Sequence, residues 1–304
     1  MATFKCFASF LLAGTMVSTL LAETHCPGNV ASLRFRLVNR SQMVVAISVD
    51  HSGPYNFLLD TGTEVTMIDP SLADDLRLKT HGTAVVAGVG LHAAASFSQL
   101  DQLAAGTHTV ANQKVLVFDL HKLQSANLKI VGILGEDFLE HFDMLIDNAY
   151  GLLCLDDSGT MRAAVKGIRV PLLAPAPTAD GVPLPNSLVI AVRLSDGIRP
   201  VRLELDSGAN APFLYDVSQY MALGLVRGKP WHGSGVDATQ RAYSALPLQD
   251  VKIGSLELPR VLFVTLIGTQ KNSRAAEFDG LLSARLFRHV FICHTDHFVV
   301  LDPW

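Results

Sequence analysis

The chain contains two copies of one sequence unit, and this duplication limits the folds that it can adopt. Around Asp60 the chain reads FLLDTGTEVTMIDPSLADDLRL, and around Asp206, 146 residues further on, it reads RLELDSGANAPFLYDVSQYMALGL. A second pair of related segments lies at 131–157 and 278–303, with offsets of 146 to 148 residues. Landmarks that keep one offset within two residues predict two copies of a unit of about 140 residues.

Each copy has the same order of parts. Two alternating strands joined by a Gly-containing turn come first and predict a β-hairpin. The second strand ends in Asp-Thr-Gly or Asp-Ser-Gly, where glycine supplies the turn. A short helical segment, a weakly patterned region, further strands, a short helix and a closing strand follow. Because strands dominate, we expect a mainly β fold with two lobes related by a pseudo-twofold axis and a few short helices.

The N-terminal residues differ from the rest of the chain. Phe7 to Ala22 is apolar and uncharged. This run is short for a membrane span, which needs about 20 apolar residues, and it suits the apolar region of a secretory signal. We therefore expect a signal peptide at 1–22, an N-terminal lobe at 23–160, a C-terminal lobe at 161–304, and export to the periplasm or the extracellular space. An uncleaved N-terminal membrane anchor is the alternative.

Composition and cysteine count exclude several classes of function. The formal net charge is −4 over 304 residues, and no run of Lys or Arg indicates a nucleic-acid surface. Cys26, Cys154 and Cys293 follow the predicted signal, so at most one disulfide and one free thiol are allowed. None of them has metal-ligand spacing. We expect no metal, no cofactor, and no membrane contact beyond the signal segment.

Asp60 and Asp206 hold equivalent places, each directly after an apolar strand. If the two copies pack about a twofold axis, these loops meet and the two carboxylates face each other. Two like charges in contact cannot both ionise easily, so they share one proton. Such a pair can activate a water for attack on an amide carbonyl. One Asp-Thr/Ser-Gly alone is a weak signal, because these are ordinary turn residues; two at matched positions predict a catalytic pair.

These residues resemble the aspartic peptidases of the retropepsin and pepsin clan, most closely bacterial retropepsin-like proteins with two lobes in one chain. The signature of that clan is Asp-Thr/Ser-Gly followed later by an apolar-apolar-Gly strand. The first copy has both, at 60–62 and at 133–135. The resemblance implies an aspartic endopeptidase that cleaves extended polypeptides. Since both aspartates lie in one chain, no obligate dimer is needed.

The same resemblance implies roles for the neighbours of the two aspartates. Thr61 and Ser207 would brace the two loops through hydroxyl hydrogen bonds, and Gly62 and Gly208 would form the tight turns. A β-hairpin at Val86 to Ser98 would close over a peptide bound as an added strand.

Several departures from the clan's pattern keep an alternative open. Ser283 replaces the glycine of the second apolar motif, Glu64 adds a negative charge near the pair, Pro212 replaces the residue that matches Thr66, and the predicted hairpin lacks Tyr and Trp. The alternative is a peptide-binding protein of the same fold without catalysis. A membrane-tethered structural component is a third possibility.

Other polar groupings have simpler interpretations. The histidines of HTDH (294–297) fall in a predicted turn, where their spacing does not suit a metal, and we expect that turn to be solvated. Asp74 and Asp75 are expected on a solvated helix face. The segment around Ser207 lacks the Gly-x-Ser-x-Gly motif of serine hydrolases.

Overall fold

A computed structural model describes residues 26–304 except 40, 89–90, 124–127, 175–186, 216, 218–229, 235–239 and 268–277. The predicted signal peptide, most of the Pro-rich segment 171–186 and the predicted second helical segment after 217 lie outside the described residues. No described helix is long and apolar enough to cross a membrane.

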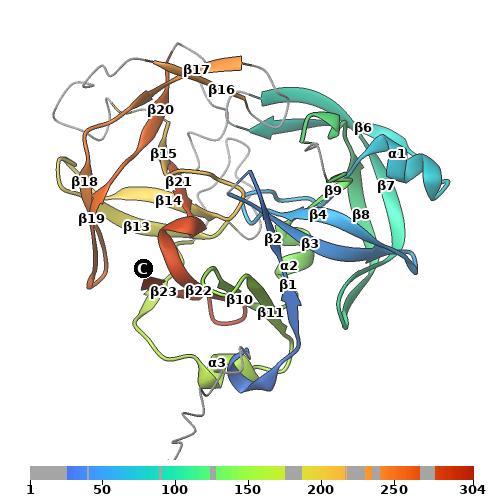
Figure 1. Cartoon of the computed structure of the whole chain (residues 1–304), viewed down its shortest axis with the longest axis horizontal. Helices are drawn as coiled ribbons and strands as arrows, with labels where there is room; N and C mark the ends of the chain where they lie inside the picture. Colours follow the sequence, from blue (N-terminus) through green and yellow to red (C-terminus); the bar gives the residue numbers. More distant parts are fainter. Residues whose placement is uncertain are drawn as a thin grey trace, which may run out of the picture.

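The described strands form three sheets (Figure 1). The sheet of the first lobe has the order β2-β3-β4-β9-β5-β8-β7-β6. Its strands are β2 (Arg36–Val38), β3 (Gln42–Val49), β4 (Ser52–Leu59), β5 (Met67–Ile68), β6 (His81–Gly88), β7 (Leu91–Ala105), β8 (His108–Val117) and β9 (Gly132–Leu134).

The sheet of the second lobe has the order β16-β17-β20-β15-β21-β14-β13-β18-β19. Its strands are β13 (Val189–Leu194), β14 (Val201–Asp206), β15 (Phe213–Leu214), β16 (Trp231–Ser234), β17 (Gln240–Ala245), β18 (Gln249–Ile253), β19 (Leu256–Val261), β20 (Val264–Leu266) and β21 (Gly280–Ser283).

The third sheet joins the two lobes, with the order β1-β11-β10-β22-β23-β12. Its strands are β1 (Ser32–Arg34), β10 (Asp143–Asp147), β11 (Leu152–Asp156), β12 (Arg169–Pro171), β22 (Phe287–Cys293) and β23 (Phe298–Pro303). We call it the central sheet. Every residue of β10 and β11 is buried. The large hydrophobic core that the two lobes share, here called the main core, covers one face of this sheet, and the segments around Cys26 and Met161 cover the other.

The helices among the described residues are short. They are α1 (Pro70–Asp75), α2 (Glu136–Leu139), α3 (Thr160–Ala164) and the 3-10 turns η1 (Pro27–Asn29), η2 (His121–Leu123) and η5 (Ala284–Leu286). Asp69 caps α1 by accepting from Ser71 N, and Asp74 and Asp75 are exposed on α1 as expected. The mainly β, bilobal fold expected from the sequence is confirmed.

Strand register shows the pseudo-twofold relation directly. Leu145 on β10 pairs with Phe291 on β22, and these residues are themselves 146 apart (291 − 145). An approximate twofold axis therefore passes between them. The offset is 148 at Ile133 and Leu281 because the second copy is two residues longer before this point. It returns to 146 because the second copy is two residues shorter between β21 and β22, where η5 replaces the α2 that lies between β9 and β10.

A disulfide fixes the N-terminal segment to the central sheet. Cys26 is bonded to Cys154 on β11, 128 residues away, with 5.8 Å between their Cα atoms. Cys293 is a buried free thiol on β22. Cys154 and Cys293 are thus buried on strands as expected, and the single bridge that the cysteine count allows is present.

Candidate active site

The two aspartate loops follow the ends of equivalent strands. Asp60 comes directly after β4 and Asp206 is the last residue of β14. Each strand has a parallel neighbour, β9 or β21, from the second apolar motif of the same copy. Asp60 N donates to Leu134 O at 3.1 Å. The fold thus brings the two Asp-Thr/Ser-Gly segments, far apart in sequence, to one place.

Thr61 and Ser207 connect the two loops by four hydrogen bonds. The Thr61 hydroxyl donates to Leu205 O at 2.8 Å and accepts from Ser207 N at 3.0 Å. Reciprocally, the Ser207 hydroxyl donates to Leu59 O at 2.9 Å and accepts from Thr61 N at 3.1 Å. Both side chains are buried. Because each hydroxyl bonds across to the other lobe, this bracing fixes the separation of the two loops.

Gly62 and Gly208 let each loop approach the carboxyl group of the other. A Cβ on Gly62 would lie 2.7 Å from Cγ of Asp206, and a Cβ on Gly208 would lie 2.6 Å from Cγ of Asp60. Neither glycine has a positive φ. The reason for glycine here is therefore close approach, and not the turn conformation that the sequence suggested.

Each carboxyl group is held by its own loop, but by different donors. Asp60 accepts from Gly62 N at 3.0 Å and from the Thr63 hydroxyl at 2.9 Å, one donor on each oxygen. Asp206 accepts from Gly208 N at 2.7 Å and from Ala209 N at 2.9 Å, both on the same oxygen.

The two carboxyl groups are hydrogen-bonded to each other, and the pKa of Asp206 departs from that of an isolated aspartate. Burial raises the pKa of Asp206 most, and the negative charge of Asp60 and their hydrogen bond raise it further. The backbone donors Gly208 N and Ala209 N lower it in part, which leaves a pKa of about 8. Burial and the neighbouring charge of Asp60 therefore favour the protonated form of Asp206.

A polar network that sequence reasoning missed supports the loop of the first lobe. Asp137 on α2 accepts from the Thr66 hydroxyl and from the Gln113 side chain, both at 2.7 Å. The Thr66 hydroxyl in turn accepts from Gly135 N at 3.1 Å. Burial raises the pKa of Asp137, against the effect of these hydrogen bonds. The sequence feature that could have indicated this network is Asp137, which lies two residues after the apolar-apolar-Gly motif at 133–135.

In the second lobe, Ser283 supplies a different support. Its hydroxyl donates to Ala209 O at 2.6 Å and accepts from Arg285 N at 3.2 Å. In the first lobe the matching carbonyl, Thr63 O, accepts from the backbone N of Glu136 at 2.8 Å. The Ser283 side chain, which stands where the clan has glycine, is buried, and its hydroxyl takes the place of that backbone donor.

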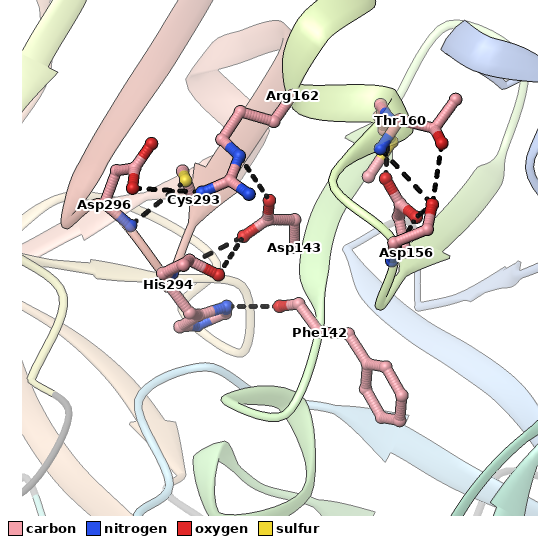
Figure 2. A network of polar contacts seen from close by, with 11 residues as sticks. Phe142, Asp143, Asp156, Thr160, Arg162, Cys293, His294 and Asp296 are labelled. Carbon is pink, nitrogen blue, oxygen red and sulfur yellow. Dashed lines mark hydrogen bonds and ion pairs between the residues drawn. The ribbon is translucent and has the colours of Figure 1, made fainter.

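The turn after β22 is exposed at 295–297 as predicted, but the side chain of His294 at its start is packed against the first lobe and is only 8% exposed. Its Nε2 lies 3.0 Å from Glu136 Oε2 and its Nδ1 2.6 Å from Phe142 O, the contact visible in Figure 2. Burial raises the pKa of Glu136. Burial is also the largest single effect on the pKa of His294 and lowers it, but the hydrogen bond to Glu136, the charge of Glu136 and the contact with Phe142 O together outweigh burial and raise this pKa overall. His297 is exposed, in accord with the prediction for the turn.

The same turn is joined to α3. Arg162 lies between Asp143 and Asp296, at 3.6 Å and 3.0 Å (Figure 2). These ion pairs and the contact between His294 and Glu136 connect the two lobes at the central sheet. Polar as well as apolar contacts therefore hold the lobes together there. The described residues hold no group of three or more His, Cys, Asp or Glu side chains suited to a metal ion.

Two β-hairpins, one per lobe, hold equivalent positions in their sheets. The predicted hairpin is β6–β7, and β16–β17 is its counterpart, which the sequence did not reveal. Figure 1 shows both hairpins on the side away from the central sheet. Trp231 and Tyr243 are cross-strand partners in the second hairpin, so the aromatic residues absent from the first hairpin occur in the second.

A comparison with models of known protein families finds a match in the first lobe. Residues 45–138 match the family model described as aspartyl protease. This segment contains the first aspartate loop, the β6–β7 hairpin and the first apolar-apolar-Gly motif. The expected resemblance to aspartic peptidases is thereby confirmed for the first lobe.

A crystal structure of a retropepsin-like aspartic protease from Rickettsia conorii is similar over 41% of this chain and 90% of that chain. The identity is 22% and the TM-score 0.30. No curated protein matches the chain.

Proposed function

We propose that the protein is an aspartic endopeptidase that hydrolyses extended polypeptides, with Asp60 and Asp206 as its catalytic pair. The observation that carries the proposal is the hydrogen-bonded carboxyl pair held between reciprocally braced loops. A pair that retains one proton over a wide pH range is what amide hydrolysis by an activated water requires.

The different settings of the two carboxyls support a different role for each. Asp60, ionised, takes a proton from a water whose oxygen attacks the peptide carbonyl carbon. Asp206 gives its proton to the carbonyl oxygen, so that no charged oxyanion accumulates. When the tetrahedral intermediate collapses, the proton held by Asp60 passes to the leaving nitrogen and a hydroxyl proton of the intermediate returns to Asp206. The pair is restored to its starting state.

A peptide would bind beneath the two hairpins. An extended chain can add to a strand edge by main-chain hydrogen bonds. Closure of β6–β7 and β16–β17 over it would exclude water from the reacting carbonyl. Both halves of the site come from one chain, so catalysis needs no dimer.

Export of the protein is also part of this proposal. The Cys26–Cys154 bond supports it, because structural disulfides persist in oxidising compartments. Mass spectrometry of the native protein would test it: a start near Glu23 agrees with a cleaved signal, and an intact first residue supports the membrane-anchored alternative.

The test of catalysis is cleavage of an unfolded protein such as casein, with wild type and Asp60→Asn compared from about pH 3 to about pH 9. The wild type is expected to lose activity as pH rises through about 8, where Asp206 releases its proton. Asp60→Asn is expected to be inactive throughout, and a statine inhibitor to block the wild type. Equal cleavage by both proteins would contradict the assignment, and saturable peptide binding without cleavage at any pH would favour the non-catalytic alternative.

A further inference from the structure

A cavity of about 530 Å³ lies on the face of the central sheet that points away from the two lobes. Leu145, Phe291 and Val300 line it. The residues that alternate with them along the strands, such as Met144 and Val290, belong to the main core on the other face. The cavity is therefore separated from the aspartate pair by the thickness of the sheet and its core.

The outer wall of the cavity is fixed by covalent and helical structure. Cys26 and Cys154 line it together with Pro27 and with Val165, directly after α3. The disulfide holds η1 against β11, so one wall cannot move away from the sheet without breaking a covalent bond. Preformed sites of this size and partly apolar lining suit a small ligand.

A row of three polar side chains crosses one end of the cavity. Asp147, His289 and Asp302 lie side by side on β10, β22 and β23, in the register next to Leu145, Phe291 and Val300. His289 Nδ1 is 2.8 Å from Asp302 Oδ2, and its Nε2 is 3.4 Å from Asp147 Oδ2. The other Asp147 oxygen accepts from Tyr150 N at 2.9 Å.

The net charge of these three side chains determines which ligand charge is favoured in the cavity. Two ionised carboxylates flank one imidazole, so the row is negative whether or not His289 carries a proton. The side chains of Asp147, His289 and Asp302 are 12%, 26% and 50% exposed, so the row runs from the interior towards solvent. A cation is favoured beside it, and an anion is disfavoured. Lys166 is exposed at the rim, where solvent screens its charge.

We propose that this cavity binds an amphipathic amine. Its ammonium group would lie at the Asp147–His289–Asp302 row, with Asp302 as the accessible acceptor. Its hydrocarbon body would lie over Leu145, Phe291 and Val300. The site is independent of the proposed peptidase activity, because it uses the opposite face of the central sheet.

The experiment compares three probes with one hydrocarbon chain and different heads: hexylammonium, 1-hexanol and hexanoate. Calorimetric titration of the intact protein near neutral pH is expected to give a Kd of about 1 mM or tighter for hexylammonium. The alcohol and the carboxylate are expected to bind at least about tenfold more weakly, since only the ammonium pairs with the row. Hexanoate binding as tightly as hexylammonium, or no saturation by hexylammonium below about 10 mM, would overturn the proposal.

Variants locate the binding. Asp147→Asn combined with Asp302→Asn is expected to weaken hexylammonium binding at least about tenfold. If the double variant fails to fold, Asp302→Asn alone is expected to weaken it about threefold, because this carboxyl is half-exposed. Lys166→Gln, a charge change at the rim of the same cavity, and Asp60→Asn at the distant pair are expected to leave the Kd within about twofold. An unchanged Kd in the aspartate variants, or a large change in Asp60→Asn, would contradict the site.

Discussion

The two lobes present the same aspartate loop but support it differently. In the first lobe, Thr63 donates a hydroxyl hydrogen bond to the carboxylate, and Thr66 and Asp137 hold the loop from behind. In the second lobe, Ala209 has no hydroxyl to donate, and Ser283 bonds back to the loop through its side chain.

The hydrogen bonds that connect the two loops are the same on both sides. The Thr61 and Ser207 bonds are matched pairwise, with corresponding lengths that differ by no more than 0.1 Å. The cross-bracing therefore sets the geometry of the pair, whereas the donors within each loop and the burial of each carboxyl set its protonation. A donor on each oxygen favours the ionised form of Asp60, and burial favours the neutral form of Asp206.

The largest expected effect comes from breaking the shared geometry. In Gly208→Ala, the new Cβ would lie 2.6 Å from Cγ of Asp60, so the loops must separate. We expect casein cleavage to fall at least about a thousandfold, because misplacing a catalytic group by about 1 Å costs two orders of magnitude or more. Gly254→Ala is the control: φ there is +58° with nothing within 4 Å, so it should lose stability but keep its activity. Normal cleavage by Gly208→Ala would contradict the close approach.

Exchanging the supports is expected to give unequal losses of stability. In Gly135→Ser, a Cβ would lie 2.7 Å from Thr63 O, a rigid backbone atom, so we expect the free energy of unfolding to fall by about 3 kcal/mol. Ser283→Gly removes one buried hydrogen bond to Ala209 O and should lower it by about 1–2 kcal/mol. Urea denaturation measures both. A larger loss for Ser283→Gly would show that the two supports are not the ones described.

A smaller effect is expected from making the first lobe resemble the second. Thr63→Ala removes the hydroxyl donor to Asp60, which raises the pKa of that carboxyl because its ionised form loses a hydrogen bond. The acid limb of the pH–rate profile should therefore move to higher pH, with kcat about tenfold lower at mildly acidic pH. Thr63→Ser, which keeps the hydroxyl, should restore the wild-type profile. An acid limb that stays unchanged in Thr63→Ala would show that the Thr63 hydroxyl does not influence the protonation of Asp60.

Part of this arrangement could be predicted from the sequence, because duplication is visible in a single chain. The constant offset places Asp60 and Asp206 at equivalent strand ends, and strand alternation indicates the mainly β fold. The reason for the glycines could not be predicted, since it depends on how closely the opposite carboxyl approaches.

Contacts between segments that are distant in the sequence could not be predicted from local sequence patterns either. His294 belongs to a turn by its local sequence, and only the packing of α2, 158 residues earlier, buries it against Glu136. Three cysteines permit three pairings, and the choice of Cys26 with Cys154 depends on η1 lying beside β11. The support by Gln113 likewise joins a strand to a helix 24 residues away.

The central claim is that Asp60 and Asp206 share one proton, and carboxyl titration tests it most directly. With aspartate labelled by ¹³C at the carboxyl carbon, NMR of the wild type should show one group with a pKa of about 8. In Asp60→Asn this pKa should fall, because the neighbouring negative charge is gone. Two carboxyls that both titrate below about pH 5, with Asp60→Asn leaving the titration of Asp206 unchanged, would contradict the shared proton.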